Sequence, residues 1–163
     1  MNSCVSNKTV TLADFNNADS LIYGIGNIGR QDDGLGWAFI DWLEEASLCP
    51  EAEIMRHYQL HLEDADLISH KKRVLFVDAT KVPEVESFHL EKIKPRMDFS
   101  FTSHAISVPS ILATCKTCFG YMPEVHFLTI KGYEWQLQQG LTERAKENLK
   151  ASTDFIKQHD ANE

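Results

Sequence analysis

The chain has 163 residues, 43% of them hydrophobic, which is enough to bury the core of one globular domain. Its formal net charge is −8 and its longest basic run is residues 71–73, which argues against a nucleic-acid or membrane-surface partner. No apolar stretch reaches membrane-spanning length, and the N-terminus lacks the regions of a signal peptide. We therefore expect a cytoplasmic protein.

The first expected elements are a strand and a helix. Residues 1–19 are polar and are predicted to form an extension outside the domain. The apolar run 21–25 predicts a buried strand. Apolar residues at helical spacing from Leu35 to Ala46 then predict an amphipathic helix.

Strands and helices alternate along the rest of the chain. Further strands are expected at residues 53–58, 73–78, 87–93 and 125–131, and helices at 62–68, after His104 and after Thr142. Pro109 suits the first turn of its helix, Gly120 suits the end of that helix, and Thr142 suits an N-cap. The alternation predicts a three-layer α/β/α sandwich, with residues 20–159 as one domain.

The turn after the first strand has the sequence GIGNIGRQDDGLG. Its glycines match those of the dinucleotide-binding fingerprint: Gly24, Gly26 and Gly29. Asp32 and Asp33, however, stand where a helix should begin, and they would repel a pyrophosphate and attract a cation. A dinucleotide-binding domain would also carry an acid at the end of the second strand, where this chain has Arg56. That domain is the weaker alternative.

Two acidic positions should meet at one edge of the sheet. Asp33 follows the first strand and Asp78 ends the third, and ligands of open α/β sheets bind beyond the carboxyl ends of such strands. With His104 at a later helix start, these residues would form a mixed oxygen and nitrogen site for a divalent ion. Without metal, two close carboxylates could instead activate water directly.

Each of these residues also has a purely structural interpretation. Asp33 could be a helix N-cap, Asp78 could cap the turn that follows it, and Asp32 is expected to serve its own turn. His57 and His61 could line the cleft or lie in a solvated loop.

The cysteines do not predict a disulfide framework in a reducing compartment. Cys115 and Cys118 form a lone C-x-x-C motif, and we expect both to be small core residues.

Four sequence blocks follow one another in a fixed order. They are G-x-G-N with D-D-x-x-G at residues 24–36, Asp78-Ala79 closing an apolar strand, Ser103-His104 before a helix, and Glu134-Trp135 with Leu141-Thr142 after the last strand. Together they resemble the hydrogenase maturation proteases, the endopeptidases that trim the large subunit of nickel-iron hydrogenases. The resemblance covers about residues 20–155.

The resemblance implies a mixed, mostly parallel five-stranded sheet with one antiparallel strand and helices on both sides. It implies that Asp33, Asp78 and His104 are the catalytic and metal-binding residues. In this family the metal is nickel already seated in the large-subunit precursor, which loses a short C-terminal extension. The implied metal is therefore nickel presented by the substrate, and the implied partner is that precursor.

The chain departs from many family members after the second strand, where they carry D-G-G-T and this chain has HYQLH at residues 57–61. The sequence there resembles the branch with Gln-Leu, often associated with soluble NAD-linked hydrogenases. We expect substrate contacts from Gln59, and from Gly26 and Asn27 of the opening motif. A non-catalytic nickel-sensing or chaperone module on the same scaffold is the alternative function.

Overall fold

The computed structural model describes residues 9–97 and 106–157. Eleven helices and strands follow one another in these ranges. In chain order they are η1 (Leu12–Phe15), β1 (Ser20–Ile25), η2 (Gln31–Gly34), α1 (Leu35–Glu45), β2 (Glu53–His57), α2 (Asp64–Ser69), β3 (Arg73–Thr80), β4 (Phe88–Lys92), α3 (Val108–Phe119), β5 (Glu124–Lys131) and α4 (Glu143–Lys157), where η marks a 3₁₀ helix.

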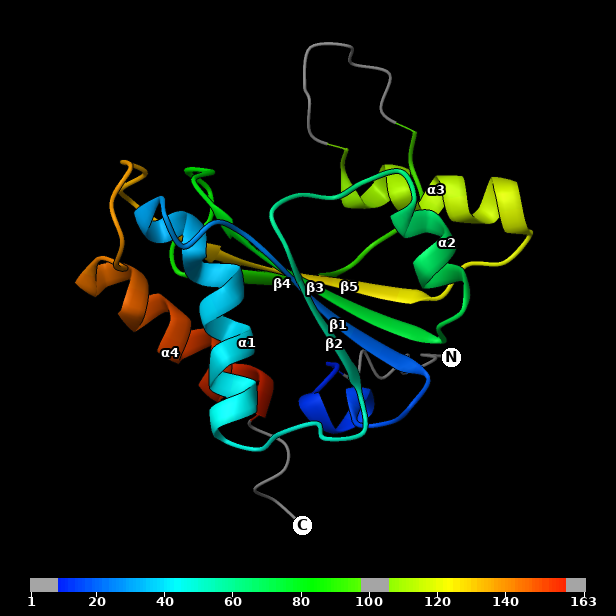
Figure 1. Cartoon of the computed structure of the whole chain (residues 1–163), viewed down its shortest axis with the longest axis horizontal. Helices are drawn as coiled ribbons and strands as arrows, with labels where there is room; N and C mark the ends of the chain where they lie inside the picture. Colours follow the sequence, from blue (N-terminus) through cyan, green and yellow to red (C-terminus); the bar gives the residue numbers. More distant parts are fainter. Residues whose placement is uncertain (1–8, 98–105, 158–163) are drawn as a thin grey trace, which may run out of the picture.

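The five strands form one mixed sheet in the order β2-β1-β3-β5-β4 (Figure 1). β1, β2, β3 and β5 are parallel, and β4 pairs antiparallel with β5 at the edge. The expected strands and helices are all present, with boundaries within about two residues for most. The predicted sheet, with one antiparallel strand, is confirmed.

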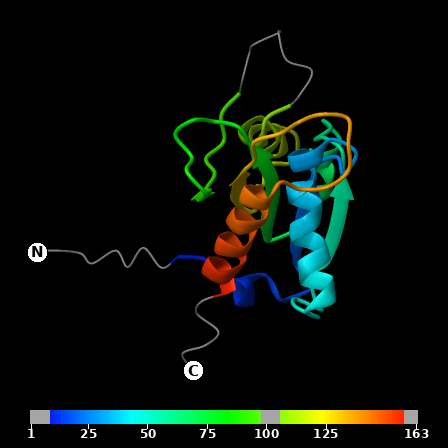
Figure 2. The ribbon, with the colours of Figure 1, turned by 90° about the vertical axis from the view of Figure 1, so that its left-hand side faces the viewer.

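Helices cover both faces of the sheet. α1 and α4 lie side by side on one face (Figure 2), and α2 and α3 contact each other on the other. The sheet therefore separates two apolar clusters. Along β1, Ile22 belongs to the cluster under α1 and α4, whereas Leu21 and Tyr23 belong to the cluster under α2 and α3. A strand buried on both faces is what a central parallel position requires, and the three-layer sandwich is confirmed.

Two glycines bring α1 directly onto the sheet. A Cβ atom on Gly36 would lie 2.1 Å from the Ile25 carbonyl oxygen and 2.6 Å from that of Val77. A Cβ atom on Gly24 would lie 2.8 Å from the Gly36 carbonyl oxygen. The first turn of α1 can therefore reach the carboxyl ends of β1 and β3 only because both residues lack a side chain.

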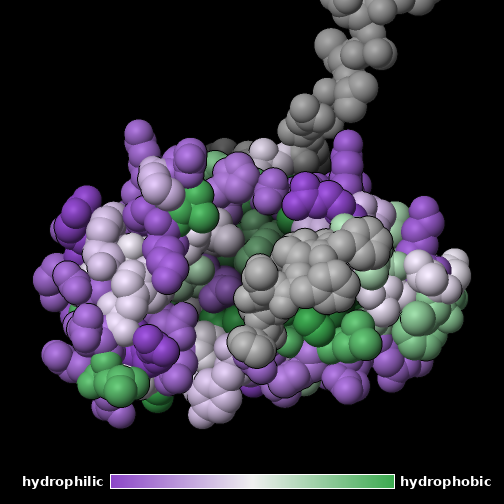
Figure 3. Space-filling view, turned by 90° about the horizontal axis from the view of Figure 1, so that it is seen from above, coloured by the Kyte–Doolittle hydropathy of each residue, from purple (hydrophilic) through white to green (hydrophobic). Residues whose placement is uncertain are grey.

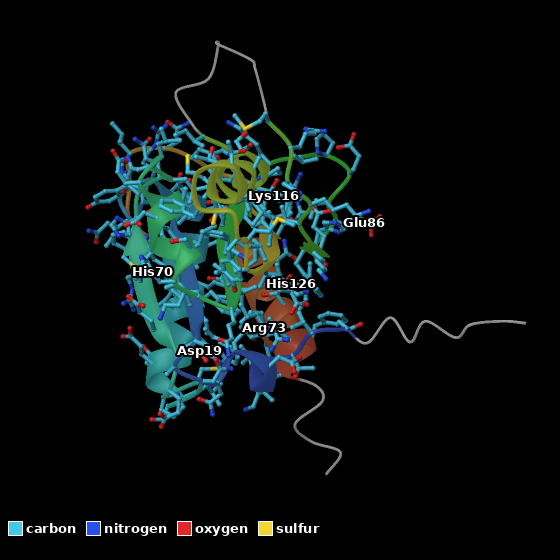
Figure 4. The ribbon with its side chains drawn as sticks, turned by 90° about the vertical axis from the view of Figure 1, so that its right-hand side faces the viewer. Asp19, His70, Arg73, Glu86, Lys116 and His126 are labelled. Carbon is cyan, nitrogen blue, oxygen red and sulfur yellow. The ribbon has the colours of Figure 1, made fainter. Side chains whose placement is uncertain are left out.

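The N-terminal segment differs from the expected polar extension. In the part that the structure describes, Leu12 and Phe15 are buried in the cluster under α1 and α4. The Arg73 guanidinium donates to the Asp14 carbonyl oxygen over 2.8 Å, at the amino ends of β1 and β3, where Figure 4 labels Asp19 and Arg73. Residues from Val10 onward thus pack as part of the domain. None of the described helices is long and apolar enough to cross a membrane.

Candidate active site

The carboxyl ends of the parallel strands carry two aspartates from distant parts of the sequence. Asp78 lies near the end of β3, and Asp33 lies in η2, between β1 and α1. Both side chains are half-buried. The space-filling view from above looks onto the loops at this edge and shows a recess with hydrophilic and hydrophobic residues (Figure 3).

The glycine turn holds the backbone of Asp33 in place. The Asp33 carbonyl oxygen accepts from the Asn27 amide over 2.9 Å, and the Asp33 amide donates to the Arg30 carbonyl oxygen over 3.1 Å. A Cβ atom on Gly26 would lie 2.2 Å from the Asp33 carbonyl oxygen, so this position requires glycine. Asn27 closes the turn with its own side chain, which accepts from the Gly29 amide over 2.8 Å. Gly26 and Asn27 therefore have structural roles, whether or not they also contact substrate.

Asp33 does not cap the helix that follows it. The N-cap of α1 is Gly34, and no side-chain capping bond is made there. The structural alternative for Asp33 is therefore wrong, and the charges near its carboxylate are those of Arg30 and Lys81. For Asp78 the local interpretation holds in part, because its carboxylate accepts from the Ala79 amide over 2.8 Å.

The charge of Asp33 influences the ionisation of Asp78. Burial raises the pKa of Asp78 to about 7, against a bond from the Ala79 amide that lowers it, and the charge of Asp33 raises it further. Burial also raises the pKa of Asp33, while the nearby cations of Arg30 and Lys81 lower it. Two desolvated carboxylates at one site favour either a shared proton or a bound cation.

A complete metal site cannot be assembled from the described residues alone. Within residues 9–97 and 106–157, no three His, Cys, Asp or Glu side chains could hold one metal ion together. His104, the expected third ligand, and Ser103 lie outside the described residues. The two carboxylates fit a divalent cation, since a positive charge would offset both the desolvation and the mutual repulsion of the pair.

Asp32 has a different role from its neighbour. It is fully buried, and its carboxylate accepts from the amides of Tyr133, Glu134 and Thr142 over 2.7, 3.1 and 2.8 Å. It also accepts from the Thr142 hydroxyl over 2.9 Å. These donors belong to residues 132–142, the segment between β5 and α4, which we call the strap. Asp32 was expected to serve its own turn. It has a structural role, but toward the strap.

Comparison with solved structures identifies the architecture. The chain is similar to the [NiFe] hydrogenase maturation protease HycI from Thermococcus kodakarensis KOD1, with 21% identity, a TM-score of 0.67, and coverage of 90% of this chain and 96% of that one. For the hydrogenase maturating endopeptidase HybD from E. coli, the identity is 14%, the TM-score 0.66, and the coverage 84% and 88%. The chain has the fold of the hydrogenase maturation proteases.

A third similar structure is the endopeptidase HycI from Escherichia coli, with 19% identity, a TM-score of 0.63, and coverage of 88% of this chain and 92% of that one. By sequence, no family model and no curated protein matches the chain. The resemblance seen in the sequence blocks is thus confirmed at the level of the fold.

The maturation-protease fold places the loop after β2 beside the same edge. His57 is half-buried and stacks on Tyr23, with ring centroids 5.3 Å apart, and its carbonyl oxygen accepts from the Trp37 indole over 3.1 Å. Tyr58 stacks on Trp37 at 5.2 Å and remains 68% exposed. Gln59 follows with an exposed side chain, so it is available to a substrate.

Asp64 fixes the far end of this loop. Its carboxylate accepts from the His61 amide over 2.8 Å and from the Tyr23 hydroxyl over 2.9 Å. Burial first, and then the charge of Asp64, raise the pKa of Tyr23 well above its usual value, so its hydroxyl stays a donor. His57 and His61 thus belong to a well-anchored loop, with the His57 ring half-buried and the His61 side chain exposed. The sequence had left open whether they line the cleft or lie in a solvated loop.

Arg56, at the end of β2, also has defined partners. Its guanidinium pairs with Asp41 over 2.6 Å and with Glu44 over 2.8 Å. A cation with two carboxylate partners occupies the position where a dinucleotide-binding domain would carry an acid.

The C-x-x-C pair is split between core and surface. Cys115 is buried and its thiol donates to the Tyr121 carbonyl oxygen over 3.1 Å, whereas Cys118 is exposed. The expectation of two core cysteines is right for Cys115 and wrong for Cys118, which lies on the outward side near the end of α3.

Proposed function

We propose that this protein is a hydrogenase maturation endopeptidase. It removes a C-terminal extension from the nickel-loaded precursor of a hydrogenase large subunit and uses the bound nickel as the recognition element. The observation that carries this proposal is the pair of interacting carboxylates, Asp33 and Asp78, at the carboxyl edge of a sheet with the maturation-protease fold.

The acid pair suits recognition of a metal ion that belongs to the substrate. Asp33 and Asp78 offer oxygen ligands from a single side, which leaves the rest of a coordination shell to groups of the precursor. His104 would supply a third, nitrogen ligand. Precursor without nickel lacks the charge that offsets the repulsion between the carboxylates, so it would bind less tightly.

Cleavage would follow from positioning. Docking the nickel against Asp33 and Asp78 holds the nearby peptide bond over the edge of the sheet, and orientation of this kind supplies much of an enzymatic rate. The metal can polarise a carbonyl or bound water. A carboxylate oxygen that the nickel leaves free could accept and return a proton during hydrolysis.

Partner and compartment follow from the same proposal. The precursor is the partner, and neither nucleic acid nor a membrane is required. The protein would act in the cytoplasm, where the thiols of Cys115 and Cys118 suit a reducing environment.

The test compares nickel-loaded and nickel-free precursor. Each is incubated with the protein, and the products are weighed by mass spectrometry. Loss of one C-terminal peptide from the loaded precursor alone is the expected result. A stable complex without cleavage would overturn the protease and favour a non-catalytic nickel-sensing or chaperone module.

Three variants assign the chemistry to the proposed residues. Asp33→Asn, Asp78→Asn and His104→Ala should each reduce cleavage by at least about a hundredfold. Asp154→Asn is the matched control, because this carboxylate lies on the exposed side of α4 and pairs only with Lys150 among the described residues. Full activity of Asp33→Asn or Asp78→Asn would remove the acid pair from the mechanism.

A further inference from the structure

A pocket of about 230 Å³ lies behind the acidic turn, between α1 and the strap. Its lining includes Ile28 of the glycine turn, Gln31 and Gly34 of η2, Ala38 and Asp41 of α1, and Leu141 of the strap. We call it the strap pocket.

The lining of the strap pocket includes a partly exposed apolar side chain on a fixed backbone. Ile28 is 49% exposed. The strap is held beside the pocket by Gln31, whose side chain accepts from the Gln136 amide over 3.1 Å and whose amide donates to the Gln138 carbonyl oxygen over 2.8 Å. Ile28 can therefore contact an apolar group that enters the pocket.

The pocket needs no rearrangement to form. Four hydrogen bonds to the buried Asp32 carboxylate fix the strap at Tyr133, Glu134 and Thr142. A preformed site avoids the entropic cost of ordering a loop when its ligand arrives.

The strap pocket and the acid pair share one short helix. Gln31 and Gly34, the first and last residues of η2, line the pocket, and Asp33 stands between them in the sequence. An extended peptide advances roughly 3.3 Å per residue, so a chain bound at the acid pair reaches the pocket within a few residues.

The charge and polarity of the lining indicate what fits. Among the described lining residues, Asp41 is the ionisable one, and it shares the single Arg56 guanidinium with Glu44, which leaves a net negative charge. The amides of Gln31 and Gln139 can bond to peptide N–H and C=O groups. Apolar walls with a negative rim suit an apolar side chain next to a lysine or arginine.

We infer that the strap pocket binds an apolar side chain of the large-subunit precursor, adjacent to a basic residue and a few positions from the bond that is cut. This inference rests on the proposed function for the identity of the partner. It assigns Ile28 and Ala38 to substrate binding, a role that the sequence blocks did not suggest.

The first experiment separates binding from chemistry. Ala38→Trp fills the pocket, and Ile28→Ala removes an apolar side chain from its wall. Each should raise KM for the nickel-loaded precursor by about three- to tenfold and leave kcat within about twofold. Phe119→Ala is the matched control, since Phe119 is also an exposed apolar residue, 48% exposed, but lies at the end of α3. An unchanged KM in Ile28→Ala, whose side chain is 49% exposed in the folded protein, would overturn the inference.

A second measurement does not depend on cleavage. Overlapping fluorescein-labelled peptides that cover the C-terminal region of the precursor are titrated with the protein and followed by anisotropy. One peptide with adjacent apolar and basic residues should bind, and Ala38→Trp and Asp41→Asn should weaken it by about threefold or more. Equal binding by Ala38→Trp would overturn the pocket, even if the wild type cleaves. Binding at the pocket without any cleavage would overturn the proposed function alone.

Discussion

Asp32 holds Thr142 by two hydrogen bonds, one from its amide and one from its hydroxyl, at 2.8 and 2.9 Å. The same hydroxyl accepts from the Ala145 amide over 3.2 Å, so Thr142 caps α4 as the sequence predicts. A single buried carboxylate thus connects the acidic turn to the start of the last helix.

Replacing Asp32 by alanine should destabilise the protein strongly. Three backbone amides and one hydroxyl would lose their buried acceptor. We therefore expect a loss of about 3–5 kcal/mol in the free energy of unfolding. Urea denaturation followed by circular dichroism measures it. The exposed control Asp154→Ala should change stability by less than about 0.5 kcal/mol. A similarly small effect at Asp32 would contradict the role of its four bonds.

Replacing Asp78 by asparagine should stabilise the protein at alkaline pH. Folding raises the Asp78 pKa from its ordinary 3.8 to about 7, so the native state prefers the protonated carboxyl. That preference stabilises the fold below about pH 4 and is lost as the pH rises to 7. Asparagine removes the penalty, and above pH 7 we expect a gain on the order of 1–3 kcal/mol, reduced because the side chain is half-buried. Thermal unfolding at pH 5 and pH 8 tests this, and a gain that is equal at both values would contradict it.

Neutralising Asp33 should lower the pKa of Asp78. The charge of Asp33 is one cause of the raised value, although burial is the larger one. NMR titration of ¹³C-labelled aspartate should show Asp78 titrating at lower pH in Asp33→Asn than in the wild type. Asp41→Asn, which removes a carboxylate on the outer face of α1, should leave the titration unchanged. If Asp33→Asn has no effect, the two carboxylates do not face each other.

His126 should make the protein less stable in mild acid. Its ring is 7% exposed, its Nδ1 atom finds no hydrogen-bond partner in the described part of the chain, and it meets Phe15 edge to face at 6.1 Å. Burial lowers the pKa of His126, and the charges of Lys92 and Arg73 lower it further. The charges of Glu124 and Asp14 raise it, but by less than the burial lowers it.

In the unfolded chain, the His126 imidazole takes up a proton below its ordinary pKa of 6.5, whereas in the native state it does so only at lower pH. Stability is fully present above that value and is lost as the pH falls. His126→Phe should flatten the change in urea midpoint between pH 7.5 and 5.5, whereas His89→Phe, on the exposed edge strand, should not. An unaltered slope in His126→Phe would show that this ring is not the group responsible.

Local sequence signals were sufficient for most of the fold. β3 is buried on both faces, so its sequence is a continuous apolar run. α1 is buried on one face, so its apolar residues recur at helical spacing. Both patterns can be recognised in the sequence directly. Gly120 ends α3 with a φ of 65°, a conformation that favours glycine, and its position was predictable for that reason.

Long-range contacts were not predictable in the same way. Asp32 and Asp33 are adjacent and chemically identical, yet only the partners of Asp32 in the strap distinguish their roles. Leu12 and Phe15 stand in a short, mostly polar segment, so no sustained periodicity marked them as core. The lining of the strap pocket likewise comes from segments about a hundred residues apart.

The attachment of the strap also bears on biosynthesis. Residues 133, 134 and 142 complete the hydrogen bonds of an acid near position 30, so a nascent chain lacks part of the frame around its acidic turn until most of it has left the ribosome. A partly translated copy would hold Asp33 and Asp78 without the segment that borders them. Competence to engage a partner would then be acquired only after the strap has been synthesised.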